Sequence, residues 1–342
     1  MLRPSRLIQC ADKTLRADLT LADGSASPMD KAQWRQRGKW LLSVVFLLAV
    51  IWIVIDRGRE LDWQEIGEAL RAYRVGTIAS SLALALLAYW ACSAYDLLSR
   101  HYVRHDIPTP TVLAIAFVSY AVNLNVGALL GGLGFRYRLY SRYGLPTAQT
   151  TQIIGLSVLT NWAGFILLAG LVLLIAPPPL QASWHLGRAA LQGAGVLALG
   201  VVAAYLVFCA AFHGRRRRWR GVDLQCPSLP FAGLQLALSS VTWLAASASV
   251  FLLLPSSVPF AAVMVAFMAS GLGGLIVRLP AGIGVLEGTF IALLGGSVGH
   301  GRLMAALLAF RAVYYIIPLV AALLLHLALE MRARRHGLAA TS

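Results

Sequence analysis

Three ionisable residues interrupt apolar sequence near the C-terminal end of the chain. Arg278 and Glu287 flank a glycine-rich break, and Arg311 follows within a long apolar run. A charged side chain at the centre of a bilayer costs roughly 2.5–3.5 kcal/mol on insertion scales, so it is retained where it pairs, is solvated or has a function. Two arginines and one glutamate cannot cancel, and the remaining positive charge predicts a site for an anionic ligand. The alternative is a structural Glu–Arg pair that fixes the break to the last span.

A second group of candidates lies in the middle of the chain. Arg136 and Arg138 directly follow another glycine-rich break. Guanidinium groups suit phosphate because their planar fork makes two parallel hydrogen bonds. For Arg136, anion binding and anchoring of the topology both stay open. Asn161 and Tyr314 complete the predicted substrate-binding set, although cross-helix hydrogen bonding and packing also explain them.

The sequence contains no pattern for nucleotide hydrolysis, for a catalytic triad or for a metal site. Walker, HExxH and Ser-His-Asp patterns are missing, and the 4 cysteines lack CxxC spacing. We therefore expect no metal, no cofactor and no enzymatic activity.

Composition identifies the class of protein. The chain is 58% hydrophobic and 13% charged, which is typical of a polytopic membrane protein. The net charge of +15 could indicate nucleic acid, but the basic residues lie between apolar runs, where they set topology. We expect no nucleic-acid partner. The run Arg215–Arg220 is interpreted as a topology anchor, with contact to anionic headgroups as the alternative.

The apolar runs predict an all-α polytopic membrane protein with about six full transmembrane helices. These spans are expected at about 40–55, 77–98, 146–175, 189–212, 229–254 and 303–329. A short interfacial helix is expected near 63–73. The domains are a disordered cytoplasmic tail at 1–38, a transmembrane domain at 39–330 and a basic cytoplasmic tail at 331–342.

Two further segments, about 110–143 and 259–297, each combine a short apolar helix with a glycine-rich break. The short helices are predicted at 111–122 and 260–271. At membrane depth, broken backbone survives only where protein or a water-filled cavity surrounds it. We therefore predict two re-entrant hairpins. Their hinge residues are Asn123, Asn125, Gly131, Gly132 and Gly134 in the first, and Pro280, Gly282 and Gly284 in the second.

Charge counting predicts how the hairpins enter the membrane. If 110–143 returns to the side from which it enters, most Lys and Arg residues and both termini are cytoplasmic. Three full spans then separate the hairpins, so they enter from opposite sides. With an offset of 150 residues, Gly132 aligns with Gly282, and Asn161 aligns with Arg311. This pattern predicts an inverted repeat, which is common in secondary transporters.

These stretches resemble a known family. The similarity lies in Tyr95–Leu98 (YDLL), Gly131–Arg142 (GGLGFRYRLYSR), Thr160–Trp162 (TNW), Leu279–Glu287 (LPAGIGVLE) and Ala309–Pro318 (AFRAVYYIIP). They are similar to the membrane (flippase) domain of the lysylphosphatidylglycerol synthetases, over about residues 40–335. In those multidomain relatives the membrane domain moves aminoacylated phospholipid between leaflets, while a soluble C-terminal domain makes it. The chain ends at Ser342 without such a part, so the resemblance implies no synthesis of lysyl-lipid.

The leading hypothesis is therefore a flippase-like lipid transporter of the bacterial inner (cytoplasmic) membrane. It would move a phospholipid or a related anionic lipid between leaflets. One alternative is a membrane-embedded lipid-modifying enzyme, and another is a non-transporting partner of lipid-synthesis enzymes. The lipid, the direction, the energy source and the oligomeric state are left open.

Overall fold

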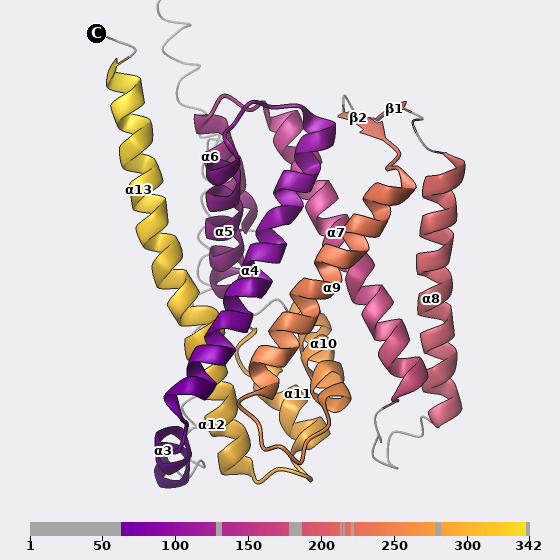
Figure 1. The fold of residues 1–342 in the computed structure, drawn as a ribbon, viewed down its shortest axis with the longest axis vertical. Helices are drawn as coiled ribbons and strands as arrows, with labels where there is room; N and C mark the ends of the chain where they lie inside the picture. The colour runs from indigo at the N-terminus through magenta and orange to yellow at the C-terminus, as the bar shows by residue number, and fades with distance from the viewer. Residues whose placement is uncertain are drawn as a thin grey trace, which may run out of the picture. The chain divides into compact units, whose positions relative to one another are not determined.

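Helices make up almost all of the described chain (Figure 1). The computed structural model describes residues 63–127, 132–177, 187–212, 214, 216–219, 222–277 and 282–339. All of these belong to one unit, Asp62–Ser342. The predictions for the tail at 1–38, the span at about 40–55, Gly131, Arg278 and Pro280 lie outside the described residues.

The helices follow one another with short connections. Their bounds are α3 (Trp63–Arg71), α4 (Val75–Val103), α5 (Thr109–Val126), α6 (Gly134–Arg142), α7 (Thr147–Ile175), α8 (Arg188–Ala211), α9 (Leu229–Phe251), α10 (Phe260–Val277), α11 (Val285–Leu294), α12 (His300–Phe310), the π-helix η4 (Arg311–Ile316) and α13 (Ile317–Ala339). Between α8 and α9, strands β1 (Arg216–Trp219) and β2 (Val222–Gln225) pair antiparallel, from Arg216 opposite Gln225 to Trp219 opposite Val222. This strand pair was not predicted from the sequence.

Six of the described helical stretches are long and apolar enough to cross a membrane. They are Val75–Arg100, Thr109–Val126, Thr147–Ile175, Arg188–Ala211, Leu229–Phe251 and His300–Ala328. The prediction of an all-α, multi-pass membrane protein is confirmed. The described set includes α5, which is long enough to span, whereas the sequence predicted a shorter helix there. It does not include the predicted span at about 40–55, which lies outside the described residues.

Two helix–break–helix segments occur where the sequence predicted breaks. In the first, α5 ends at Val126, with Gly127 as its C-cap, and α6 begins at Gly134. In the second, α10 ends at Val277 and α11 begins at Val285. In both, the two helices pack against each other. Figure 1 shows α5 and α6 in the upper half of the view and α10 and α11 in the lower half.

Both first helices run further than predicted, and close packing explains this for α10. Each contains 18 residues, although the glycines of α10 favour an earlier end. At Gly273, inside α10, a Cβ would lie 2.7 Å from the Val285 side chain of α11. A glycine here therefore lets the two helices approach closely. Similarly, a Cβ on Gly271 would lie 3.2 Å from the Trp243 ring of α9. These glycines bring neighbouring elements close, rather than ending the helix.

A buried aromatic cluster joins elements from distant parts of the sequence. Tyr89 of α4 packs on Tyr314 of η4, with ring centroids 5.5 Å apart. Phe310 stacks on Tyr314 at 5.0 Å and meets Phe267 of α10 edge-on at 5.8 Å. Each of these rings is at least nine-tenths buried. The cluster therefore fixes α4 and α10 around the start of the last long helix.

Candidate functional site

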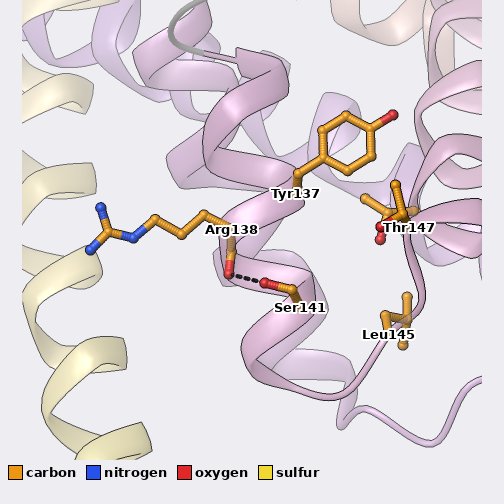
Figure 2. A pocket seen from close by; sticks show the side chains of 6 residues that line it. Tyr137, Arg138, Ser141, Leu145 and Thr147 are labelled. Carbon is orange, nitrogen blue, oxygen red and sulfur yellow. Dashed lines mark hydrogen bonds between the residues drawn. The ribbon is translucent and has the colours of Figure 1, made fainter. Parts of the chain in front are cut away.

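Helix α6 carries two of the predicted arginines, and they face different surroundings. Arg138 lies on the exposed side and borders a shallow hollow of about 330 Å³, with Tyr137, Ser141 and Thr147 (Figure 2). Its carbonyl accepts a hydrogen bond from the Ser141 hydroxyl at 2.9 Å. The guanidinium group points away from the hollow, toward α13 (Figure 2). Arg138 therefore contributes backbone, and not its charge, to this surface.

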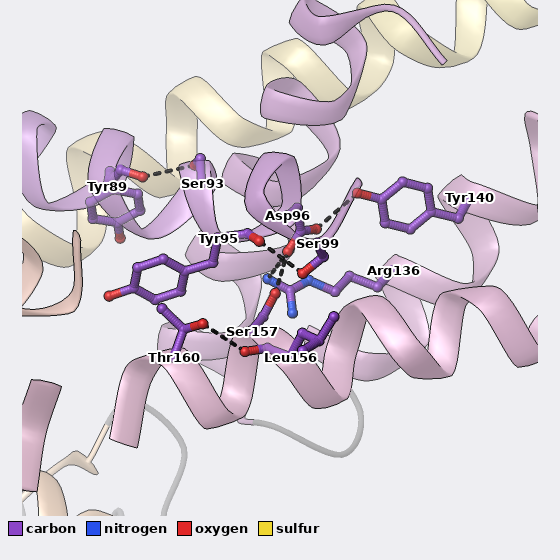
Figure 3. A network of polar contacts seen from close by, with 10 residues as sticks. All are labelled: Tyr89, Ser93, Tyr95, Asp96, Ser99, Arg136, Tyr140, Leu156, Ser157 and Thr160. Carbon is purple, nitrogen blue, oxygen red and sulfur yellow. Dashed lines mark hydrogen bonds and ion pairs between the residues drawn. The ribbon is translucent and has the colours of Figure 1, made fainter. Parts of the chain in front are cut away.

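Arg136 points inward and forms an ion pair with Asp96 of α4 (Figure 3). The distance from an Arg136 terminal nitrogen to Asp96 Oδ1 is 3.2 Å. The Ser157 hydroxyl donates to the same oxygen at 2.7 Å, and the Tyr140 hydroxyl donates to Oδ2 at 2.9 Å. Asp96 is fully buried, so this network connects α4, α6 and α7 around one carboxylate. A buried acid requires such compensation, because an unpaired charge in a low-dielectric interior is costly.

The arginine in this network has fewer partners than the aspartate. Arg136 is 12% exposed, and its Nε atom is buried without a hydrogen-bond partner among the described residues. Asp96, by contrast, accepts from three groups. The guanidinium therefore keeps a donor that an additional oxygen ligand could use.

A second ion pair joins α11 to the start of η4. Arg311 donates from Nε to Glu287 Oε1 and from a terminal nitrogen to Oε2, the latter at 2.9 Å. Arg311 also lies over the Tyr315 ring, 5.5 Å from its centroid. The two partners are 15% and 16% exposed. The Glu–Arg pair that the sequence left as an alternative is therefore present in the structure.

The same pair also holds the break between α10 and α11. The backbone N–H of Gly284 donates to Glu287 Oε2 at 2.9 Å, and Arg311 reaches the Gly282 carbonyl at 3.4 Å. Gly284 has a φ of 80°, which favours glycine because other residues are strained there. Glu287 thus satisfies a backbone donor at the N-terminus of α11, where a carboxylate is also favoured by the helix dipole.

The remaining predicted residues lie in interhelical contacts. The Tyr314 hydroxyl is 3.2 Å from that of Tyr120, within the aromatic cluster. Asn125 donates to the Tyr315 carbonyl at 3.3 Å. The backbone carbonyl of Asn161 accepts from Ser239 and Trp243 of α9, so α7 is joined to α9 and not to either ion pair at this point.

Glycine 132 allows the first break to fold back on its own helix. A Cβ on Gly132 would lie 2.7 Å from the Asn123 side chain. The chain can therefore return beside α5 only with a residue that has no side chain. Both residues were predicted as hinge positions, and the close approach gives their pairing a steric reason.

Asp96, Tyr140 and Ser157 were not predicted from the sequence as members of a site. Asp96 offered a signal, because it is an acidic residue in an apolar span, and such residues indicate function or pairing. Tyr140 and Ser157 offered none, since hydroxyls are common in helices of this kind. Whether Arg136, Arg138, Asn161, Arg278, Glu287, Arg311 and Tyr314 bind a substrate stays a prediction.

His105, in the connection between α4 and α5, lies near Tyr140, which bonds to Asp96 of the first ion pair. Its ring centroid lies 6.4 Å from that of Tyr140, and its side chain is 8% exposed with both nitrogens unbonded among the described residues. Burial, and then the nearby Arg100 guanidinium, lower the pKa of His105, while Asp106 and Asp96 oppose them. His105 is therefore held as the neutral imidazole.

The described part of the chain contains no group of three His, Cys, Asp or Glu side chains placed to hold a metal ion. Two carboxylates of the described helices, Asp96 and Glu287, are instead each paired with an arginine. Each pair consists of one arginine and one carboxylate, and each fixes the second helix of a helix–break–helix segment to a long helix. Each pair is formally neutral, with the guanidinium charge compensated by the carboxylate.

Comparison with known proteins gives consistent results. Residues 40–322 match the family described as the lysylphosphatidylglycerol synthase TM region. The chain is 40% identical over 304 residues to the inner membrane protein YbhN of Escherichia coli, covering 89% of this chain and 95% of that protein. It is 30% identical over 278 residues to slr0712 of Synechocystis, covering 80% and 85%.

More distant similarity extends to larger proteins. Phosphatidylglycerol lysyltransferase of Staphylococcus haemolyticus is 28% identical over 306 residues, which cover 84% of this chain but 33% of that enzyme. The match is thus to about a third of the lysyltransferase. With apolar helices throughout the described chain and a family match over most of its length, this protein belongs to the lysylphosphatidylglycerol synthase TM-region family.

Proposed function

We propose that the protein is a lipid transporter of the inner membrane that moves an anionic phospholipid, or a related lipid, between leaflets. The observation that supports this most is the pair of helix–break–helix segments, each fixed by an Arg–carboxylate pair within apolar helices. The name of the E. coli relative supports the location. The name of the staphylococcal relative supports the cargo, because phosphatidylglycerol is an anionic phospholipid.

In this proposal the two segments are re-entrant hairpins of an inverted repeat. The long helices α7, α8 and α9 lie between them in the sequence. If these three are the spans between the hairpins, their odd number would put the two entrances on opposite sides of the membrane. Both termini would then be cytoplasmic. Many secondary transporters form their substrate site from broken helices of two inverted halves, at the interface between the halves.

The arginines supply the chemistry for a lipid phosphate. Among the described residues, a buried N–H donor of Arg136 has no partner, and Arg311 is partly exposed beside the glycine break. A phosphate oxygen could replace a carboxylate oxygen at either guanidinium, since both anions accept parallel hydrogen bonds. Asp96 and Glu287 would thus occupy the arginines while no lipid is bound, and the lipid headgroup would compete with them.

Lipid exchange in reconstituted vesicles tests this proposal. Purified protein is placed in vesicles that carry fluorescent phosphatidylglycerol, and the fraction accessible to an external quencher is followed with time. Arg311→Ala should lower the exchange rate at least about tenfold, the factor that corresponds to 1.4 kcal/mol. Arg302→Ala is the matched control, because Arg302 lies on α12 and is exposed. It should exchange lipid at the wild-type rate.

Two results would contradict parts of this proposal. If folded Arg311→Ala protein exchanges lipid at the wild-type rate, the Arg311–Glu287 pair has no role in transport. Mass spectrometry of the same vesicles would reveal a modifying enzyme by the appearance of a new lipid species. A panel of anionic, zwitterionic and aminoacylated lipids then defines the cargo.

A further inference from the structure

The π-helix η4 lies directly between α12 and α13 and begins at Arg311. In a π-helix each turn holds an extra residue, and the hydrogen bonds run from residue i to residue i+5. The N–H of Ile317 accordingly donates to the carbonyl of Ala312. Such a turn sets how the residues before it are rotated about the helix axis relative to those after it. The direction of Arg311 therefore depends on η4.

Pro318 gives the physical reason for the wide turn. In an α-helix the N–H of residue 318 would bond to the Tyr314 carbonyl, but proline has no N–H and its ring collides with that carbonyl. The Tyr314 carbonyl accepts instead from the Tyr89 hydroxyl of α4, at 3.0 Å. A side chain from another helix thus replaces the missing backbone donor.

A second side chain reaches η4 from the first helix–break–helix segment. Asn125 donates to the Tyr315 carbonyl at 3.3 Å, and it lies in the last turn of α5, just before the break at Gly127. At its other end η4 presents Arg311 to Glu287 of α11. One turn of helix is therefore in contact with the break of the first segment and with the ion pair of the second.

We propose that η4 couples the two helix–break–helix segments, with Tyr89 and Asn125 as the residues that position Arg311 against Glu287; as a device for alternating access, this coupling rests on the transport function proposed above. Pro318 keeps the turn wide, and Tyr89 and Asn125 hold the Tyr314 and Tyr315 carbonyls so that Arg311 faces Glu287. Movement of α5 withdraws Asn125 from the Tyr315 carbonyl, which loosens the turn and weakens the Arg311–Glu287 pair.

A double-mutant cycle on thermal unfolding tests the coupling without any transport measurement. Tyr89→Phe removes only the hydroxyl that bonds to η4, and Glu287→Gln removes the partner of Arg311. If the two sites are coupled, the loss of Tm in the double variant is smaller than the sum of the two single losses. An additive result overturns the proposal.

Tyr95→Phe is the matched control for this cycle. Tyr95 lies on the same helix as Tyr89 and is also buried. Its hydroxyl donates to Thr242 of α9 at 2.7 Å and not to η4, so Tyr95→Phe removes a buried hydrogen bond elsewhere. Combined with Glu287→Gln it should give additive losses. Non-additivity of the same size with Tyr95→Phe would show a general weakening of α4 and would overturn the specific role of Tyr89.

Pro318→Ala provides a second test from within the helix. Alanine restores the N–H, so the turn can narrow and the Tyr314 carbonyl no longer needs Tyr89. The protein should unfold at or above the wild-type Tm, and Glu287→Gln should cost less Tm in this background than in the wild type. An equal cost in both backgrounds overturns the coupling.

The two proposals can fail separately. A wild-type protein that exchanges no lipid, but gives the non-additive cycle, defeats the transport function and keeps the link through η4. A protein that exchanges lipid and gives additive cycles defeats the link alone.

Discussion

In both helix–break–helix segments an Arg–carboxylate pair fixes the second helix, but the charges of the two partners are exchanged. In the first, the second helix α6 contributes the cation Arg136, and the long helix α4 contributes the anion Asp96. In the second, α11 contributes the anion Glu287, and the cation Arg311 is the first residue of η4, directly after α12. The two second helices therefore carry opposite charges, and each pair is complementary.

The two pairs also differ in burial, and this difference separates their roles. Asp96 is fully buried and accepts three donors, so its removal would leave Arg136 in the interior without a counter-charge. Glu287 and Arg311 are partly exposed and hold a glycine break. We interpret the first pair as the stronger structural lock and the second as the pair that an anion from outside can more readily open.

Asp96→Asn should produce the largest loss of stability. The substitution keeps the shape of the side chain but removes the charge that compensates Arg136, and breaking a buried ion pair costs about 3–5 kcal/mol. Chemical or thermal unfolding in detergent measures the loss. Asp106→Asn is the matched control, because Asp106 is exposed in the connection after α4, and it should change stability by less than about 0.5 kcal/mol. Equal losses in both variants would contradict the assigned role of the buried pair.

Gly132→Ala should produce an intermediate effect that is confined to the first segment. The added Cβ meets the Asn123 side chain at 2.7 Å, and overpacking of this kind costs about 1–3 kcal/mol. Gly134→Ala is the matched control, since a Cβ there has nothing within 4 Å. It should leave stability nearly unchanged or raise it slightly, because alanine favours helix. A Gly134→Ala variant that is as unstable as Gly132→Ala would show that both glycines serve backbone freedom and not close packing.

The backbone preferences of glycine and proline allow the two breaks to be predicted from the sequence, but the long-range contacts between helices cannot be predicted in this way. Glycine and proline act on the backbone around them, so the breaks near Gly132 and Gly284 could be placed from the sequence alone. The Glu287–Arg311 pair could be stated as an alternative, because both residues stand out in apolar sequence. The partners of Asp96 could not, since Tyr140 and Ser157 come from other helices and reach it only through tertiary packing.

The π-helix η4 also depends on a long-range contact that the sequence does not reveal. Pro318 was visible in the sequence, yet the segment at 303–329 was predicted as one uninterrupted span. A proline inside a helix can produce a kink, an end or a wide turn, and neighbouring donors decide which of these is stable. Here the decisive donor is the Tyr89 hydroxyl, which lies 225 residues earlier in the chain.

His105 should give the smallest effect, and it shows whether the first pair is sealed on the side of the α4–α5 connection. Because burial and Arg100 lower its pKa, folding favours the neutral ring, and this contribution is fully present above the ordinary histidine pKa of about 6.5. This stabilising contribution is lost as the pH falls from about 6.5 toward the lowered pKa of His105, because the unfolded chain binds the proton at a higher pH than the folded chain. His105→Gln should therefore reduce the drop in Tm between pH 8 and pH 5, whereas His300→Gln, at an exposed position, should not. An unchanged drop in His105→Gln would mean that water already reaches this ring, and the connection between α4 and α5 would then be an entrance to the Asp96 network and not its cover.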